Sequence, residues 1–213
     1  PSGVVYTRET LVALGELLTR KSAEYGHPIY IISDEPYREL VYDASAEVPY
    51  LTNLYDHTLV CYSFSKSLSL PGERIGYVLV SDSCTDKEDI FYAICGAGRS
   101  LGYVCAPALF QYLIPKVLGK TSDIEIYRKN RDILYSALVS YGYSVVKPDG
   151  AFYLFVKAPG GNSKGFAQKA MEKDLLIVPG NDFGCPEYFR LCYCGPLEKI
   201  QKSLPIFEKL MEE

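Results

Sequence analysis

The chain has 213 residues, of which 48% are hydrophobic and 23% charged, so it is long enough to bury a sizeable core and has an ordinary globular composition. Its 22 Lys and Arg against 26 Asp and Glu give a formal charge of −4, which argues against a general nucleic-acid binder. No apolar run approaches the roughly 18 residues that a membrane span needs, and the first residues lack the pattern of a signal peptide, so no membrane partner is expected. Seven cysteines without a regular framework favour a reducing, cytoplasmic setting.

The first part of the chain is predicted to contain one helix followed by three short strands. Regularly spaced leucines after Thr7, a residue suited to cap a helix, predict a helix that ends near Gly26. Apolar runs at 29–32, 59–62 and 75–80 predict strands, and their apolar character on both faces suits the centre of a parallel sheet. This succession of elements indicates an α/β fold.

The third predicted strand is expected to run antiparallel to the second. The link between them, residues 63–73, contains Pro71-Gly72 and is shorter than the dozen or more residues that a crossover helix needs. The end of the second strand and the start of the third then lie at the same edge of the sheet. Open α/β sheets bind ligands at the carboxyl edge of their parallel strands.

The rest of the chain is predicted to be helical at first and then mixed. Helical spacing over 101–118 and 123–141, with a kink or break at Pro115, precedes an α+β pattern. The later elements are strands at 143–147, 151–156, 175–178 and 188–193, with helices at 163–174 and from 196. We therefore expect a partial large domain over 1–110 and a C-terminal small domain over 111–213.

Polar side chains are expected at the sheet edge where the strands meet. Asp34 and Tyr37 follow the first strand. The second strand is followed by Ser63, Ser65 and Lys66, and Arg74 precedes the third. Two hydroxyls and an arginine are the donors that a phosphate monoester needs. The lysine could be a further phosphate contact or a Schiff-base nucleophile, and the carboxylate would hold a protonated ring nitrogen. Together these groups describe a site for pyridoxal phosphate, although singly each is also typical of a turn, a helix cap or a solvated loop.

Short motifs form a recognisable series along the chain. They are Pro1-Ser2-Gly3, Asp34-Glu35-Pro36-Tyr37, Ser63-Phe64-Ser65-Lys66, Gly72-Glu73-Arg74-Ile75-Gly76-Tyr77, Pro148-Asp149-Gly150-Ala151, Val178-Pro179-Gly180 and Phe189-Arg190-Leu191. In this order they resemble the motifs of the class I/II aminotransferases of pyridoxal phosphate fold type I, the aspartate aminotransferase-like enzymes. The resemblance implies the C-terminal part of a fold type I large domain, with a mostly parallel sheet and one antiparallel strand, followed by an α+β small domain.

The resemblance also implies a role for each candidate residue. Lys66 would form the Schiff base with pyridoxal 5'-phosphate and shuttle the substrate proton. Asp34 would pair with the ring nitrogen of the cofactor and Tyr37 with its phenolic oxygen. Arg190 would bind the α-carboxylate of the substrate, with a surface salt bridge as the ordinary alternative. The cofactor phosphate would be held by Ser63, Ser65 and Arg74.

The enzyme implied by this resemblance is longer than the present chain. It would act as a cytoplasmic homodimer and transfer an amino group between a small-molecule amino acid and a 2-oxo acid, with an aspartate-type substrate as the default. The chain begins with Pro1 rather than Met, and the upstream half of the family, which supplies the other wall of the site, has no counterpart in it. We therefore expect the isolated chain to be inactive.

Other functions stay open at this point. A C–S lyase or decarboxylase of the same fold would use the same lysine, and the chain could be a non-catalytic domain fragment. Ser63-x-x-Lys66 also fits the serine β-lactamase and penicillin-binding motif, but Pro71-Gly72 leaves little room for a helix and no Lys-Thr-Gly follows. Gly119-Lys120-Thr121 resembles the end of a P-loop, yet Ile114 stands where the first glycine must be. Cys192-x-Cys194 lacks metal-ligand spacing, so we interpret it as core or strand cysteine and expect no metal site.

Overall fold

The computed structural model describes residues 1–43 and 47–212, which belong to two compact units. The lysine unit comprises Tyr6–Leu40 and Ala44–Ser122 and contains Lys66. The arginine unit contains Arg190 and comprises Pro1–Val5, Val41–Asp43 and Asp123–Glu213. The boundary expected between residues 110 and 111 falls inside the lysine unit, and the division of a longer enzyme into domains at that point stays a prediction.

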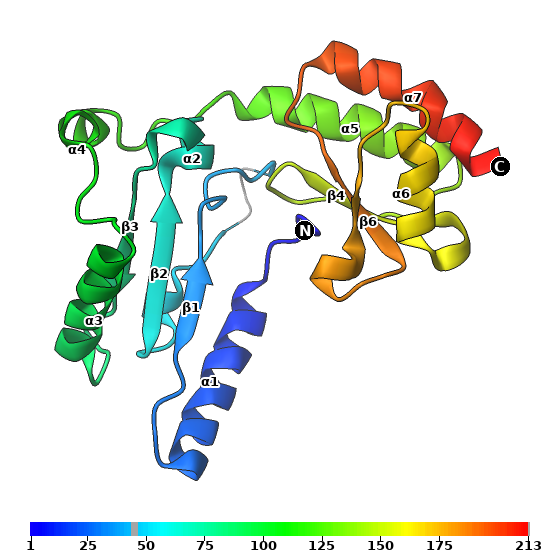
Figure 1. The fold of residues 1–213 in the computed structure, drawn as a ribbon. Helices are drawn as coiled ribbons and strands as arrows, with labels where there is room; N and C mark the ends of the chain where they lie inside the picture. Colours follow the sequence, from blue (N-terminus) through cyan, green and yellow to red (C-terminus); the bar gives the residue numbers. More distant parts are fainter. Residues whose placement is uncertain (44–46, 213) are drawn as a thin grey trace. The chain divides into compact units, whose positions relative to one another are not determined.

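The lysine unit is built on a three-stranded sheet of order β1-β2-β3 (Figure 1). Strand β1 (Ile31–Asp34) pairs in parallel with β2 (Thr58–Ser63), and β3 (Gly76–Val80) pairs antiparallel with β2. The expected direction of the third strand is therefore confirmed. The short link that contains Pro71-Gly72 has no room for a crossover helix, so β3 runs back beside β2 in the opposite direction.

Helix α1 (Arg8–Tyr25) begins where its capping residue predicts. The Thr7 hydroxyl accepts a hydrogen bond from the Thr10 amide at 3.3 Å, and Gly26 ends the helix in the left-handed region with φ 72°. The helix lies alongside β1 in Figure 1. Of the leucines whose spacing predicts the helix, Leu14 and Leu17 are exposed.

The helices that follow the sheet differ from the prediction. Helix α3 (Lys87–Ser100) was not predicted, and none of its residues, all of which are described, is buried. The helix predicted over 101–118 is wrong at its start, since Gly102 turns the chain with φ 87° and Pro107 cannot donate a backbone hydrogen bond. Helical structure resumes as α4 (Ala108–Leu113), followed by a 3-10 turn over Ile114–Lys116.

The arginine unit has a second three-stranded sheet, of order β4-β6-β5, in which both strand pairs are antiparallel. Its strands are β4 (Tyr153–Lys157), β5 (Val178–Pro179) and β6 (Tyr188–Cys192). The helices α5 (Ile124–Ser140), α6 (Ser163–Met171) and α7 (Leu197–Glu212) belong to the same unit (Figure 1). Its core is aromatic and aliphatic, with the fully buried side chains Leu138, Leu154, Val156, Phe189, Tyr193 and Phe207.

The strand predicted over 143–147 is not formed as such. Only Val145 makes an isolated antiparallel bridge, to Val156 in β4. Tyr143 is instead buried in the core, where its hydroxyl donates to the Phe207 carbonyl at 2.8 Å. The apolar run therefore serves as a packed connection between α5 and the sheet rather than as a full strand.

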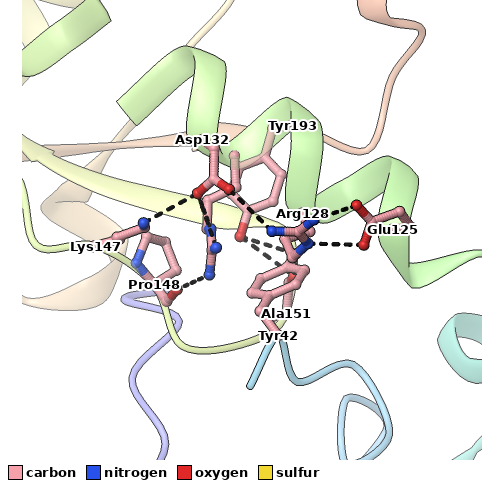
Figure 2. Close-up of polar contacts among 9 residues, drawn as sticks. Tyr42, Glu125, Arg128, Asp132, Lys147, Pro148, Ala151 and Tyr193 are labelled. Atoms are coloured by element: carbon pink, nitrogen blue, oxygen red, sulfur yellow. Dashed lines mark hydrogen bonds and ion pairs between the residues drawn. The ribbon is translucent and has the colours of Figure 1, made fainter. Parts of the chain in front are cut away.

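A buried polar cluster joins Val41–Asp43 to the rest of the arginine unit (Figure 2). The Tyr42 hydroxyl donates to the Ala151 carbonyl and lies 3.2 Å from the Tyr193 hydroxyl. The guanidinium of Arg131 lies 4.3 Å from the centroid of the Tyr42 ring and donates to the Pro148 carbonyl at 2.9 Å. These contacts secure the Pro148-Asp149-Gly150-Ala151 turn, because they bind it at both ends.

An acidic residue completes this cluster on α5. Asp132 accepts from Arg131 at 2.9 Å and from Lys147 at 3.2 Å. Figure 2 marks the contact between Asp132 and Lys147. Although burial acts to raise it, the pKa of Asp132 is held below its usual value by these two cations. The carboxylate thus stays ionised between its partners.

Among the described residues, no helix combines the length and the apolar character that crossing a bilayer requires.

Candidate functional site

The ends of β1 and β2 bring the predicted cofactor residues to one edge of the sheet. Asp34 is the last residue of β1, opposite Cys61, and Ser63 is the last residue of β2, opposite Gly76 of β3. The Glu35 amide donates to the Cys61 carbonyl at 2.8 Å, which continues the pairing past the strand end. Because β1 and β2 are parallel and β3 is antiparallel, Arg74, just before β3, also belongs to this edge.

Lys66 lies beside Tyr37 at this edge. Its Nζ is 5.8 Å from the centroid of the Tyr37 ring, so the residues after β1 and after β2 are neighbours in space as predicted. Lys66 belongs to α2 (Phe64–Ser67), which begins immediately after β2. Phe64 is buried with Ile75 and Ile114 in a small apolar cluster beneath this helix, which anchors the segment that carries the lysine.

Two hydroxyl groups lie together at the start of α2. The Ser63 hydroxyl caps the helix by accepting from the Ser65 amide at 3.2 Å, and the two Oγ atoms are 2.7 Å apart. Ser63 therefore stands at a helix start, but α2 is only four residues long, in agreement with the expectation that Pro71-Gly72 leaves little room for a helix there. The missing Lys-Thr-Gly motif is a second argument against a β-lactamase-type site.

The segment that joins Asp34 to Tyr37 is held by an ion pair that the sequence motifs did not single out. Arg38 Nε lies 2.6 Å from Glu35 Oε2, and each side chain is 10% exposed. Arg38 also donates to the carbonyls of Val48 and Pro49, at 2.6 and 2.9 Å. The i, i+3 spacing of the two charges is the one signal in the sequence that could have indicated this pair.

Asp34 influences its cross-strand neighbour. Burial, and next the charge of Asp34, raise the pKa of the Cys61 thiol above its usual value. Cys61 therefore stays a neutral thiol near neutral pH.

The backbone geometry at Arg74 and Gly76 shows how the motif that contains them fits at the start of β3. Arg74 adopts the left-handed region with φ 52°, and its Nη1 donates to the Pro71 carbonyl at 2.8 Å. A Cβ on Gly76 would lie 2.2 Å from the Tyr62 carbonyl oxygen, so only glycine fits where β3 meets β2. Arg74 is exposed, and its guanidinium is available to an anion at this edge.

Arg190 belongs to the arginine unit and lies on β6. Its guanidinium carbon is 4.5 Å from the centroid of the Tyr153 ring and 4.7 Å from that of Phe183. Stacking engages the faces of a guanidinium and leaves the N–H groups at its edge for a carboxylate. Within residues 1–43 and 47–212 no carboxylate forms a salt bridge with Arg190, so the ordinary surface ion pair is absent there.

The first motif of the chain packs against the turn motif in the same unit. The Gly3 carbonyl accepts from the Asp149 and Gly150 amides at 2.9 and 3.0 Å. Gly3 has φ 71°, and a Cβ there would lie 2.5 Å from Pro148 Cβ. Glycine is therefore required at this contact for both conformation and space.

No group of three or more possible metal ligands is found in the part of the chain that the structure describes. Cys192 and Cys194 approach each other, with 3.2 Å between the sulfur atoms.

Comparisons with known proteins agree on one family. The family model described as aminotransferase class I and II matches residues 1–204. The aspartate aminotransferase of Bacillus subtilis is 34% identical over 100% of the chain, which covers 55% of that protein. A crystal structure of an aminotransferase from Eubacterium rectale is 57% identical, with a TM-score of 0.95, and the chain covers 53% of it.

A second solved structure is also similar to the chain. The crystal structure of aspartate aminotransferase from Thermotoga maritima has a TM-score of 0.83 and 30% identity, over 100% of the chain and 54% of that protein. The present chain thus spans about half the length of the relatives it matches. Since the family model matches nearly all of the described residues, the chain belongs to the aminotransferase class I and II family.

Proposed function

We propose that this chain is the lysine-bearing portion of an enzyme that transfers an amino group between an amino acid and a 2-oxo acid. The observation that carries the proposal is the contact between Lys66 and Tyr37 at the sheet edge that also holds Asp34. A carboxylate, a phenol and a primary amine at the end of parallel strands are the groups that a pyridinium aldehyde requires. The match to relatives named aspartate aminotransferase supports an aspartate-type substrate.

The residues at this edge fit pyridoxal 5'-phosphate. The paired hydroxyls of Ser63 and Ser65, 2.7 Å apart, are neutral donors for a phosphate, and Arg74 contributes a guanidinium. Asp34 offers a carboxylate to the ring nitrogen, and Tyr37 offers a phenol to the ring oxygen. When bound, the cofactor supplies an aldehyde that condenses with amines and a ring that accepts electrons.

Lys66 has two tasks in this proposal. Its Nζ would hold the cofactor until an amino acid takes its place. The released amine would then move a proton between the substrate Cα and the cofactor carbon that carried the aldehyde, in one direction in the first half of the exchange and in the other in the second. The Tyr37 ring beside it limits where the amine can reach.

Arg190 binds the substrate in this proposal. Its guanidinium receives the α-carboxylate with two parallel hydrogen bonds, as the flat arrangement of its donors favours. The rings of Tyr153 and Phe183 hold the guanidinium in place and exclude water from its faces. Because every amino acid carries this carboxylate, Arg190 sets the class of substrate rather than the individual amino acid.

We assign the activity to a protein that also contains the part of the relatives' sequence that this chain does not cover. The chain spans 53–56% of relatives such as the enzymes from Methanocaldococcus jannaschii and Thermotoga maritima. We expect the isolated chain to bind the cofactor weakly or not at all and to show no turnover. A homodimer in the cytoplasm is part of the same proposal.

Borohydride reduction of the full-length holoenzyme tests the assignment. Reduction fixes the cofactor to its lysine, and peptide mapping should then find the label on Lys66. Lys66→Ala should lose both the label and the transamination, whereas the matched variant Lys116→Ala, an exposed lysine of the same unit, should keep both. A label on another lysine contradicts the assignment.

Product analysis separates transamination from the chemistry of related enzymes. An aminotransferase produces one new amino acid for each amino donor consumed. Release of ammonia or a thiol would indicate a C–S lyase, and release of carbon dioxide a decarboxylase. The absence of any bound cofactor absorbance near 420 nm in the full-length protein would indicate a non-catalytic module.

A further inference from the structure

Cys192 and Cys194 form a close pair of exposed thiols in the arginine unit. Cys192 is the last residue of β6, and Cys194 follows two positions later. Their sulfur atoms are 3.2 Å apart, which is closer than ordinary van der Waals contact. The side chain of Tyr193 between them is fully buried, so both thiols lie on the opposite, solvent-facing side of the segment.

The backbone holds this pair in place. The Tyr193 amide donates to the Phe152 carbonyl at 3.0 Å. Asn130, which is 1% exposed, donates through Nδ2 to the carbonyls of Tyr193 and Gly195, at 2.9 and 2.8 Å. These hydrogen bonds fix the backbone that carries the two thiols. The backbone geometry therefore keeps the two side chains close together.

The pair lies next to Arg190 on the same strand. Alternate residues of a strand share a face, so Cys192 and Arg190 are on one face of β6. Cys192 stands opposite Tyr153 in β4, and Tyr153 is the ring on which the Arg190 guanidinium stacks. Movement of the Cys192 side chain therefore alters the packing of Tyr153, the residue on which the Arg190 guanidinium stacks.

We propose that Cys192 and Cys194 are a site of reversible oxidation by hydroperoxides, which join them in an intrachain disulfide that weakens carboxylate binding at Arg190. The second half of this inference rests on the proposed role of Arg190 in substrate binding. A disulfide bond is about 2.05 Å long, so the sulfur atoms approach by roughly a further 1 Å when it forms. Since Asn130 holds the intervening backbone, side-chain rotation closes this distance, and rotation of Cys192 changes what the ring of the opposite residue Tyr153 packs against.

The chemistry needs one hydroperoxide for each disulfide. One thiolate attacks the O–O bond, forms a sulfenic acid and releases water or an alcohol after proton transfer. The second thiolate then attacks the sulfenic sulfur, forming the S–S bond and breaking the S–O bond, and the oxygen leaves as water. Two thiols lose two electrons and the peroxide gains them. A dithiol reductant reverses the reaction by thiol–disulfide exchange.

Mass mapping of the full-length holoenzyme tests the oxidation. The reduced enzyme is treated with a small excess of hydrogen peroxide, quenched with N-ethylmaleimide and digested. The peptide that contains residues 192–194 should lose two hydrogens, escape alkylation and recover both thiols after dithiothreitol. Cys192→Ser and Cys194→Ser should each prevent this change, and the matched variant Cys95→Ser, which removes an exposed cysteine of the lysine unit, should not.

Kinetics of the same samples test the effect on Arg190. Oxidation should raise the KM for the amino acid by about 5-fold or more, as is typical of coupling between sites, with a smaller change in kcat. Reduction should restore the original value, and Cys194→Ser should keep the KM of the reduced enzyme throughout.

Each failure has its own meaning. Alkylation of both thiols after peroxide treatment, or a disulfide with a different cysteine, overturns the proposed oxidation site. A disulfide between Cys192 and Cys194 that leaves KM unchanged overturns the coupling to Arg190. If the reduced enzyme does not transaminate, the proposed function fails, while the mass measurement still decides whether the disulfide forms.

Discussion

The Nζ of Lys66 lies 5.8 Å from the centroid of the Tyr37 ring, although the two residues follow different strands of the sheet. Neither residue could meet the other if β1 and β2 were antiparallel, because the two strand ends would then lie at opposite edges. The parallel pairing of β1 with β2 is therefore the feature on which the candidate site depends.

Replacing Tyr37 tests the phenol at this edge. In Tyr37→Phe the ring beside Lys66 is kept and the hydroxyl is lost, so any hydrogen bond to a charged cofactor oxygen disappears. Such bonds contribute about 1.5–3 kcal/mol, and we expect cofactor affinity to fall by about 10-fold or more. Equilibrium dialysis with pyridoxal phosphate measures this. Equal affinity in Tyr37→Phe and the wild type would exclude the proposed contact.

Replacing Arg190 with lysine tests paired recognition of a carboxylate. Arg190→Lys keeps the charge but loses the second parallel hydrogen bond, so the KM for the amino acid should rise by about 10-fold or more, with a smaller fall in kcat. Arg128→Lys is the matched control, since Arg128 forms an exposed ion pair with Glu125 on α5. An unchanged KM in steady-state assays of Arg190→Lys would remove Arg190 from the site.

The ion pair between Glu35 and Arg38 predicts an effect on stability. Both side chains are 10% exposed, and Glu35→Gln leaves the guanidinium of Arg38 buried without its charge partner. The free energy of unfolding should fall by about 3–5 kcal/mol. Glu47→Gln breaks the exposed pair with Arg8 and should cost less than about 1 kcal/mol. Urea denaturation of both variants makes the comparison, and equal losses would contradict it.

The close approach at Gly76 predicts a steric effect. Gly76→Ala places a Cβ 2.2 Å from the Tyr62 carbonyl oxygen, so β2 and β3 must separate. We expect a loss of about 1–3 kcal/mol in unfolding free energy. A Cβ on Gly72 meets no atom within 4 Å, and Gly72→Ala should be close to neutral. Thermal unfolding of the two variants measures this difference. A Gly76→Ala variant as stable as the wild type would contradict the prediction.

Tyr42 predicts a pH dependence of stability. Burial raises the pKa of Tyr42 to about 12 from 10.0, so the neutral phenol is favoured in the folded state. Its contribution is complete below pH 10 and is lost as the pH rises toward 12, because the unfolded chain ionises first. The stability difference between the wild type and Tyr42→Phe should therefore shrink over this interval. Urea titrations at pH 9 to 12 measure the difference, and a constant gap would be inconsistent with a raised pKa.

The order of strands in the lysine unit could be predicted because it depends on short-range information. The length of the Ser63–Glu73 link excludes a crossover, and that alone makes β3 antiparallel. The residues flanking the strand ends then come to one edge. Helix α3 was not predicted, and the run over 143–147 was misread because an apolar connection and a strand share the same composition.

The sequence by itself determined the chemistry that this chain can offer: an amine, a carboxylate, a phenol, two hydroxyls and two guanidinium groups in the order typical of the family. Only the tertiary structure decided which of them are neighbours and how they are supported. The Glu35–Arg38 pair, the aromatic rings around Arg190 and the contact between Cys192 and Cys194 all depend on burial and on side-chain distances. Although the members of the first and last pairs are close in sequence, their burial and side-chain distances arise from packing against segments distant in the chain, which local patterns do not encode.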